Sequence, residues 1–144
     1  RANNIYGIRQ FPEKIIPKFI SRALNNSNLQ IQGDGANKRH YLSALDFASA
    51  LEVICKKALS GEIYNIASDL ELSNLEVAKL INNLIRNNGN LENIEFVQDR
   101  PFNDSRYAVN DIKLRNLGWK PTRSLIKDLP EVIKWYDQNP DWFN

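Results

Sequence analysis

Apolar residues recur at helical spacing in four stretches of the chain. The pattern predicts helices over residues 11–26 and 46–58, a third helix that begins at Ser73, and a fourth around residues 132–136. Ser73 is followed three positions later by Glu76, the spacing of a capping box, in which each residue satisfies a free backbone N–H of the other. Amphipathic helices therefore dominate the predicted secondary structure.

Individual residues refine these helices. Pro12 suits the first turn of the first helix, where a missing N–H costs nothing, and Pro17 would bend the same helix. Asp46 is the expected N-cap of the second helix. Cys55 falls on the apolar face of that helix and is expected to be an inert core residue.

Three short stretches have strand character. Residues 29–32 alternate between apolar and polar side chains, and residues 63–67 and 94–97 are rich in β-branched and aromatic side chains. Gly33-Asp34-Gly35 directly after the first stretch marks a turn. Strands mixed with a majority of helices predict an α/β or α+β fold, and no internal repeat or domain boundary interrupts it.

Composition limits the class of protein. The 144 residues carry a net charge of +2 without a basic block, which argues against a nucleic-acid binder. No apolar run approaches the roughly 20 residues of a membrane span. A single cysteine excludes an internal disulfide and fits a cytoplasmic location, and no His, Cys or Asp spacing suits a metal. Because the chain has no Met, we expect Arg1 to be an internal position of a longer chain or the start of a cloned fragment.

Three arginines stand in turn contexts instead of on helix faces: Arg39, Arg100 and Arg106. The guanidinium group holds phosphate oxygens with a rigid fork of donors. Each such charge-assisted bond contributes roughly 1.5–3 kcal/mol. A phosphate ligand is therefore one interpretation, and solvated or salt-bridged surface arginines are the other.

Two segments carry a family resemblance: residues 4–14, NIYGIRQFPEK, and residues 99–107, DRPFNDSRY. They resemble the C-terminal half of the nucleotide-sugar 4,6-dehydratases of the extended short-chain dehydrogenase/reductase superfamily. The resemblance implies an α/β fold in which residues 1–144 form the C-terminal substrate-binding portion of a Rossmann-type enzyme. The strand at 63–67 would belong to the Rossmann sheet, and the N-terminal NAD-binding part would lie outside this chain.

The resemblance also implies a substrate site. Arg39 and Arg100 would grip the diphosphate of a nucleotide sugar, Lys14 would contact the diphosphate or the base, and Ile5 would lie beside the nicotinamide of NAD. No catalytic residue and no metal ligand is expected in this chain. The residues expected to bind substrate are Asn4, Lys14, Ile15, Gln30, Ile31, Gln32, Arg39, Asn74, Asp99, Arg100, Pro101, Phe102, Asn103 and Tyr107.

For the intact enzyme the resemblance implies an NAD-dependent lyase and a homodimer. A Tyr-x-x-x-Lys pair would help oxidise the sugar at C4, an Asp–Glu pair would eliminate water across C5 and C6, and hydride would return at C6. The product would be a 4-keto-6-deoxy sugar nucleotide, a precursor of rhamnose or a related deoxysugar. None of these groups occurs here in usable form, so the chain alone is expected to be inactive.

Several alternatives stay open. The motif at 99–107 and the ending at 139–143 look closer to plant UDP-glucose enzymes than to bacterial dTDP-glucose enzymes, but either base fits the framework. Ile8 and His40 depart from the family pattern, which usually has Pro and Asp there. A sugar-nucleotide epimerase or decarboxylase of the same superfamily is one competing function. A non-catalytic nucleotide-sugar-binding module is another.

Overall fold

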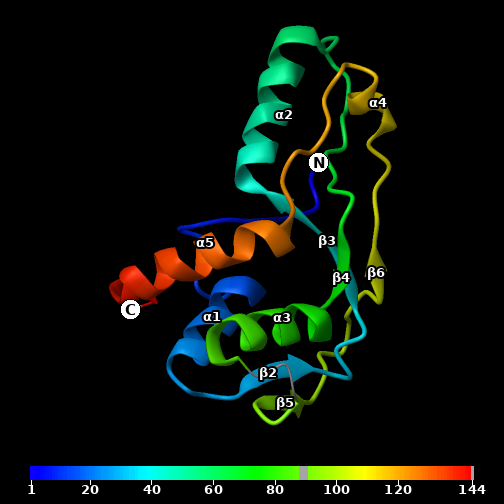
Figure 1. The fold of residues 1–144 in the computed structure, drawn as a ribbon. Helices are drawn as coiled ribbons and strands as arrows, with labels where there is room; N and C mark the ends of the chain where they lie inside the picture. Colours follow the sequence, from blue (N-terminus) through cyan, green and yellow to red (C-terminus); the bar gives the residue numbers. More distant parts are fainter. Residues whose placement is uncertain (88–90, 144) are drawn as a thin grey trace.

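The computed structural model describes residues 1–87 and 91–143 (Figure 1). Its helices are α1 (Ile15–Leu24), α2 (Ala44–Lys57), α3 (Asn74–Arg86), the short α4 (Ile112–Arg115), α5 (Leu125–Gln138) and a final 3₁₀ turn, η1 (Pro140–Phe143). Its strands are β1 (Asn4–Tyr6), β2 (Leu29–Gln32), β3 (Lys38–Ser43), β4 (Glu71–Ser73), β5 (Ile94–Val97) and β6 (Arg106–Tyr107).

β3 is the centre of the larger sheet. It runs parallel to β1, with Asn4 opposite Tyr41, and parallel to β6, with Arg39 opposite Tyr107. β4 pairs with the same half of β3 as β6 does, in antiparallel register, with Arg39 opposite Leu72. β2 and β5 form a separate parallel pair at the far end of the molecule (Figure 1). Parallel strands joined through helices make this an α/β fold.

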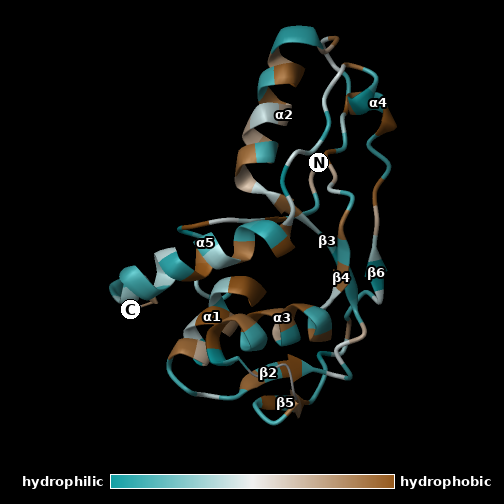
Figure 2. Cartoon of the chain, in the orientation of Figure 1, coloured by the Kyte–Doolittle hydropathy of each residue, from teal (hydrophilic) through white to brown (hydrophobic). Residues whose placement is uncertain are grey.

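The main core lies where α1, α3 and α5 meet, between the two sheets (Figure 1). Phe19 and Ile20 of α1, Ile81 of α3 and Leu129 and Tyr136 of α5 are almost fully buried there. Brown apolar segments face this junction in Figure 2, and teal polar segments cover the outside. Each fully buried large apolar side chain contributes about 1.5–3 kcal/mol, so this cluster fixes the three helices to each other.

Local signals placed α3 correctly. The amide of Glu76 donates to Ser73 Oγ at 3.1 Å, and the amide of Ser73 donates to Glu76 Oε2 at 2.7 Å, which completes the predicted capping box. The backbone N–H of Ser73 also holds the pKa of the Glu76 carboxyl below its usual value. The strands predicted at 29–32 and 94–97 are β2 and β5.

The first helix is shorter than predicted. Residues 11–14 are not helical, and α1 begins at Ile15 with Lys14 as its N-cap. Pro17 is consequently the third helical residue instead of an interior one. It causes no interruption, because the first four N–H groups of a helix have no intrahelical acceptor. The fourth helix, α5, begins at Leu125 and includes Pro130.

Two predictions about α2 were wrong. Ser43, not Asp46, is the N-cap, because Ser43 Oγ accepts from the amide of Leu45 at 3.3 Å. Cys55 is exposed instead of buried, because it lies on the side of α2 that no described element covers. Leu51 on the same side is 43% exposed. Helical spacing marks an apolar face but does not say that the chain covers it.

Asp46 has a different role from a cap. Its carboxylate is 3% exposed and accepts three hydrogen bonds from the segment that precedes α5. The donors are the amide of Thr122 at 3.0 Å, its hydroxyl at 2.8 Å, and the amide of Arg123 at 2.9 Å. Asp46 therefore ties the start of α2 to the start of α5.

The strand predicted at 63–67 is reduced to a single bridge. Ile66 pairs in parallel with Ala2, through bonds from the amide of Asn3 to Ile66 O at 3.2 Å and from the amide of Ile66 to Arg1 O at 2.8 Å. Among the described residues only 1–3 pair with this segment through their backbone, so the ladder is no longer than one bridge. Conversely, β3 and β4 were not predicted, because their polar residues gave no strand pattern.

Candidate functional site

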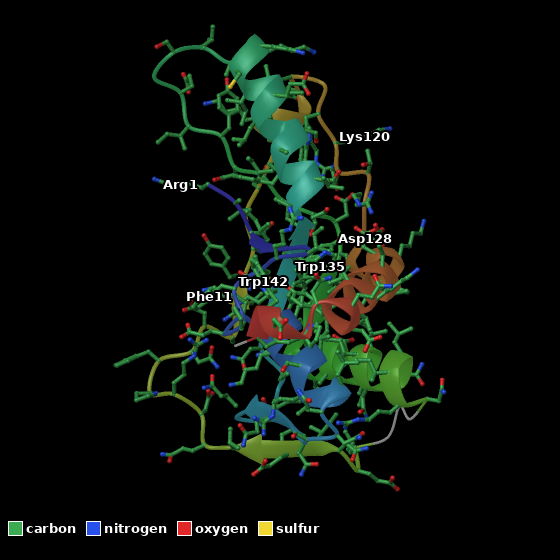
Figure 3. The ribbon with its side chains drawn as sticks, turned by 90° about the vertical axis from the view of Figure 1, so that its left-hand side faces the viewer. Arg1, Phe11, Lys120, Asp128, Trp135 and Trp142 are labelled. Atoms are coloured by element: carbon green, nitrogen blue, oxygen red, sulfur yellow. The ribbon has the colours of Figure 1, made fainter. Side chains whose placement is uncertain are left out.

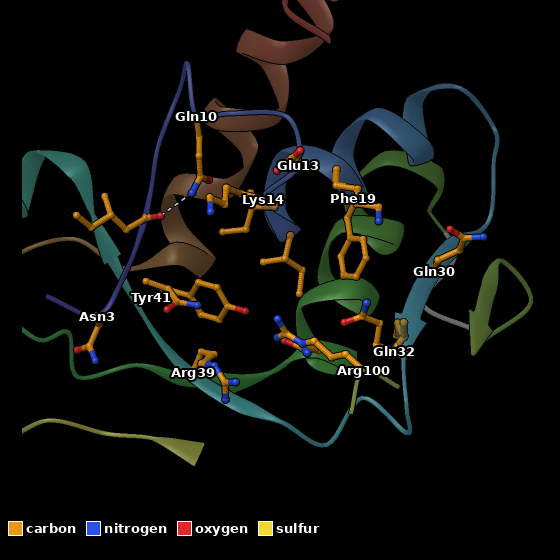
Figure 4. Close-up of a pocket in the computed structure, with 17 residues that line it drawn as sticks. Asn3, Gln10, Glu13, Lys14, Phe19, Gln30, Gln32, Arg39, Tyr41 and Arg100 are labelled. Carbon is orange, nitrogen blue, oxygen red and sulfur yellow. Dashed lines mark hydrogen bonds between the residues drawn. The ribbon is translucent and has the colours of Figure 1, made fainter. Parts of the chain in front are cut away.

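One cleft of about 660 Å³ opens between the two sheets (Figure 4). Its walls come from β1, the N-terminal turn of α1, β2 and β3, with single residues from the start of α3 and from the loop after β5. Strand ends and a helix start meet here, so backbone positions around the cleft are fixed by the sheets and by the core of α1.

The cleft is strongly basic. Four of its side chains are cationic, Lys14, Lys18, Arg39 and Arg100, and only Glu13 is anionic. Within the described residues none of the four cations forms a salt bridge. An excess of unpaired positive charge in a concave site attracts an anion, because the low-dielectric walls concentrate the field.

Arg100 is held by its own loop. Its Nη2 donates to Asn103 Oδ1 at 3.0 Å, and Asn103 Nδ2 donates to Asp99 Oδ1 at 2.9 Å. The same Asp99 oxygen accepts from the amide of Arg100 at 2.9 Å. This small network restrains the guanidinium at the rim of the cleft before any ligand arrives, and it reduces the entropy lost on binding.

The loop that carries Arg100 packs against a glycine turn. Gly33 has φ +63°, and a Cβ there would lie 2.9 Å from Asp99 Oδ2. Gly35 has φ +74°, and a Cβ there would lie 2.8 Å from Ile31 Cγ2. Both positions therefore need glycine for backbone conformation and for space. The turn predicted at Gly33-Asp34-Gly35 is confirmed, and it lies against the loop after β5 that carries Arg100.

The end of the chain fastens another part of the cleft wall. Tyr136 is fully buried, and its hydroxyl accepts from the amide of Gln10 at 2.9 Å. That hydroxyl also lies 3.1 Å from Gln10 O, to which Trp142 Nε1 donates at 3.0 Å. Figure 3 shows Trp142 beside Phe11, on the neighbouring segment. The segment 7–14, which ends in Lys14, is thus held by α5 and η1.

The structure brings together two thirds of the residues predicted from the sequence. Those that line the cleft are Asn4, Ile5, Lys14, Ile15, Gln30, Ile31, Gln32, Arg39, Asn74 and Arg100. Those that do not line it are Asp99, Pro101, Phe102, Asn103 and Tyr107. Asp99 and Asn103 hold Arg100, Phe102 is 93% exposed, and Tyr107 is 43% exposed on β6. Ligand contact by each of these residues remains a prediction.

Sequence reasoning missed several cleft residues. Asn3, Gln10 and Tyr41 line the cleft, as do Lys18 and Phe19. Lys18 and Phe19 follow Lys14 by about one helical turn, so the spacing of α1 could have indicated them. Burial raises the pKa of the Tyr41 hydroxyl to about 12, so this group is a neutral phenol at physiological pH.

His40 has structural partners. Its Nδ1 lies 2.9 Å from Ser68 O, and its Nε2 lies 3.5 Å from Glu71 Oε1, so it links β3 to β4 and to the segment before β4. No group of three or more possible metal ligands occurs within residues 1–87 and 91–143. In the same part of the chain no helix has the length and apolar character that crossing a membrane requires.

Comparison with known proteins agrees with the fold. The chain superposes on a dTDP-glucose 4,6-dehydratase from Bacillus anthracis, solved in complex with NAD, with a TM-score of 0.90 and 37% identity over 99% of this chain. A dTDP-glucose 4,6-dehydratase from Streptomyces venezuelae, also with NAD bound, gives a TM-score of 0.93 and 32% identity over the whole chain. The fold is therefore that of the extended short-chain dehydrogenases/reductases.

The model of one family matches residues 1–131, and its description is GDP-mannose 4,6 dehydratase. The chain belongs to this family. It is 46% identical, over 99% of its length, to a trifunctional UDP-glucose 4,6-dehydratase, epimerase and reductase from Arabidopsis thaliana. It is 39% identical to the human dTDP-D-glucose 4,6-dehydratase. The chain spans 21% of the plant protein and 43% of the human one, and 44–45% of the two bacterial structures.

Proposed function

We propose that this chain is the nucleotide-sugar-binding part of an NAD-dependent 4,6-dehydratase that acts on UDP-glucose or dTDP-glucose. The basic cleft carries the proposal: four cations that form no salt bridge with any described residue surround a space large enough for a nucleotide sugar. A diphosphate is the anion that two arginine forks and a lysine suit best. The relatives named above act on UDP-glucose or dTDP-glucose, which supports the same substrate class.

In this proposal the chain binds and orients the substrate. Arg39 and Arg100 hold the diphosphate from β3 and from the loop after β5, and Lys14 approaches it from the start of α1. Gln30 and Gln32 flank the base. Fixing the diphosphate in this way brings the sugar to the reacting groups at short distance, which can lower a barrier by several kcal/mol through lost translational freedom alone.

The cleft also offers a surface for NAD. Ile5 is half-buried on β1 and lines the cleft, so it supplies the apolar contact that a nicotinamide ring requires. NAD, when bound, accepts hydride from the sugar carbon C4 and returns it at C6. We assign most of the NAD site, together with the Tyr-x-x-x-Lys and Asp–Glu pairs, to a preceding part of a longer protein, which makes residues 1–144 its C-terminal half.

Two observations support a longer protein. The relatives are more than twice as long as this chain. α2 also presents an uncovered apolar side that includes Leu51 and Cys55, beside the short parallel bridge at Ala2 and Ile66. A Rossmann half would cover that side of α2 and extend the bridge into a sheet. A homodimer remains a prediction of the family resemblance, and a cytoplasmic location remains a prediction from the single cysteine.

The test is a product assay on the protein expressed from the full reading frame, with NAD and either UDP-glucose or dTDP-glucose. Formation of a 4-keto-6-deoxy sugar nucleotide from one substrate supports the proposal and identifies the base. An epimerised or decarboxylated product would instead assign the protein to another activity of the superfamily. Tight nucleotide-sugar binding without any product would favour a non-catalytic binding module.

A further inference from the structure

Unpartnered polar atoms gather at one end of the cleft. Four buried side-chain atoms of cleft residues have no hydrogen-bond partner: Nδ2 and Oδ1 of Asn3, Oε1 of Gln10 and the hydroxyl of Tyr41. The described residues contain only one other atom of this kind, Oδ2 of Asp111. Leaving such a group without a partner costs about 1–3 kcal/mol, so a cluster of four points to a ligand that supplies the partners.

The backbone positions of these three residues are fixed through β1. Asn3 immediately precedes β1 and is 5% exposed. Tyr41 lies on β3 opposite Asn4 and is 1% exposed. Gln10 donates from Nε2 to Ile5 O at 2.7 Å. Only the tips of the side chains lack partners, and the terminal torsion of an amide is broad enough to turn its free atom toward a ligand.

The position of Asn3, Gln10 and Tyr41 in the cleft indicates which part of the ligand they would contact. In Figure 4, Asn3, Gln10 and Tyr41 lie on the left, Gln30 and Gln32 lie on the right, and Arg39 and Arg100 lie along the lower edge. The hydroxyl of Tyr41 points toward the middle of the cleft in this view. With the base at Gln30 and Gln32 and the diphosphate at the two arginines, the sugar falls on the left.

The chemistry of the three groups suits a sugar hydroxyl. An amide and a phenol each donate and accept hydrogen bonds, as a hydroxyl group does. All three side chains are neutral, and the raised pKa of Tyr41 keeps it so well above physiological pH. A carboxylate would find no charge partner among them, and burying an uncompensated carboxylate is far more costly than burying a hydroxyl.

We propose that Asn3, Gln10 and Tyr41 form a subsite that binds the hydroxyl groups of a neutral hexosyl unit and disfavours a hexuronosyl unit. The proposal rests on the proposed function, because it takes the ligand to be a nucleotide sugar. It adds a specificity that the basic cleft does not determine, since Arg39 and Arg100 would hold the diphosphate of a glucose and a glucuronic acid nucleotide equally well.

The experiment is calorimetric titration of the protein from the full reading frame with UDP, UDP-glucose and UDP-glucuronic acid, and with dTDP and dTDP-glucose in parallel. Tyr41→Phe removes one oxygen and keeps the ring, and Asn3→Ala removes both amide atoms. Tyr64→Phe is the matched control, since the structure gives its hydroxyl no hydrogen bond within the described residues. Melting temperatures verify that each variant is folded.

We expect Tyr41→Phe to weaken hexose-nucleotide binding about 2- to 13-fold, the range for one lost hydrogen bond between neutral groups. Asn3→Ala removes two polar atoms and should weaken it at least as much, with nucleoside diphosphate binding unchanged in both variants. The unmodified protein should bind UDP-glucose at least tenfold more tightly than UDP-glucuronic acid. The subsite is overturned if the variants lose affinity for UDP and UDP-glucose equally, or if they lose affinity for neither. It is also overturned if the unmodified protein binds UDP-glucose and UDP-glucuronic acid with equal affinity. In each of these cases the diphosphate site is unaffected. Absence of all nucleotide binding overturns both proposals.

Discussion

Removing the hydroxyl of Tyr136 tests whether its hydrogen bond to Gln10 holds the segment 7–14 of the cleft wall in place. Tyr136→Phe removes one oxygen and keeps a fully buried ring, which stacks on Phe143 at 5.1 Å between centroids. The amide of Gln10 then loses its acceptor, whereas Gln10 O keeps the bond from Trp142 Nε1. One partly buried donor is left unsatisfied, so the free energy of unfolding should fall by about 1–3 kcal/mol.

The assay is urea unfolding, followed by fluorescence, of the unmodified protein, Tyr136→Phe and the control Tyr64→Phe. The control removes a tyrosine hydroxyl outside this network and should change the free energy of unfolding by less than about 0.5 kcal/mol. Loosening the segment that ends in Lys14 should also weaken diphosphate binding up to about tenfold, because binding must then order that segment. Equal stabilities for the two variants would show that the Tyr136–Gln10 bond does not hold the wall.

Asp46→Ala leaves three donors without an acceptor and should lower the free energy of unfolding by about 3 kcal/mol in urea unfolding, and Asp46→Asn should lower it by about half as much. A loss below about 1 kcal/mol for the alanine variant would show that Asp46 does not hold the start of α2 to the start of α5. Arg100→Lys should lower the affinity for UDP or dTDP about 10- to 100-fold by calorimetry, because lysine cannot form the bidentate contact, and unchanged affinity would contradict that role. The fold raises the pKa of Tyr41 from 10 to about 12, so the folded protein keeps the phenol proton up to a higher pH than the unfolded chain. The contribution of Tyr41 to the free energy of unfolding is therefore complete below pH 10 and falls by about 1.4 kcal/mol per pH unit between pH 10 and 12. Tyr41→Phe should abolish this part of the loss of stability at alkaline pH. Leu51→Glu should change the free energy of unfolding of the 144-residue chain by less than about 0.5 kcal/mol, but should lower that of the full-length protein by about 2 kcal/mol or more. Equally small changes in both proteins would mean that nothing covers this side of α2.

Elements with a local chemical signal were predictable from the sequence. The start of α3 follows from Ser73 and Glu76, because a capping box is satisfied within one helical turn. β2 and the turn after it follow from an alternating pattern and two glycines that must adopt positive φ. In these places the residues that decide the structure are neighbours in the chain, so no knowledge of the tertiary fold was needed.

β3 was missed because its role in the cleft conflicts with a strand pattern. The sequence of its first half, Lys38 to His40, is typical of a solvated loop. In the structure this half is a strand, and Arg39 on it lines the cleft. Polar residues in a strand are stable here because β4 and β6 pair with this half. Neither partner is strongly indicated by its own residues, so the pairing is a property of the whole fold.

The candidate site likewise contains residues that could be predicted from the sequence and residues that could not. Arg39 and Arg100 could be selected by type and context, and the family resemblance supplied the rest of the predicted set. Asn3 and Tyr41 could not be selected, because a missing hydrogen-bond partner is visible only when the neighbours of an atom are known. Likewise Asp99 and Asn103 were predicted as ligand contacts, whereas the structure shows them bonded to Arg100.

The attachment of Gln10 to the end of the chain has a consequence for biosynthesis. Its partners Tyr136 and Trp142 follow it by 126 and 132 positions. At roughly 5–20 residues per second, a ribosome delivers Tyr136 about 6–25 s after Gln10. During that interval Arg39 and then Arg100 are added to the nascent chain, while the wall that carries Lys14 is still unsupported. A transcript that stops before Tyr136 would therefore yield a product that has every residue of the cleft but no properly assembled cleft.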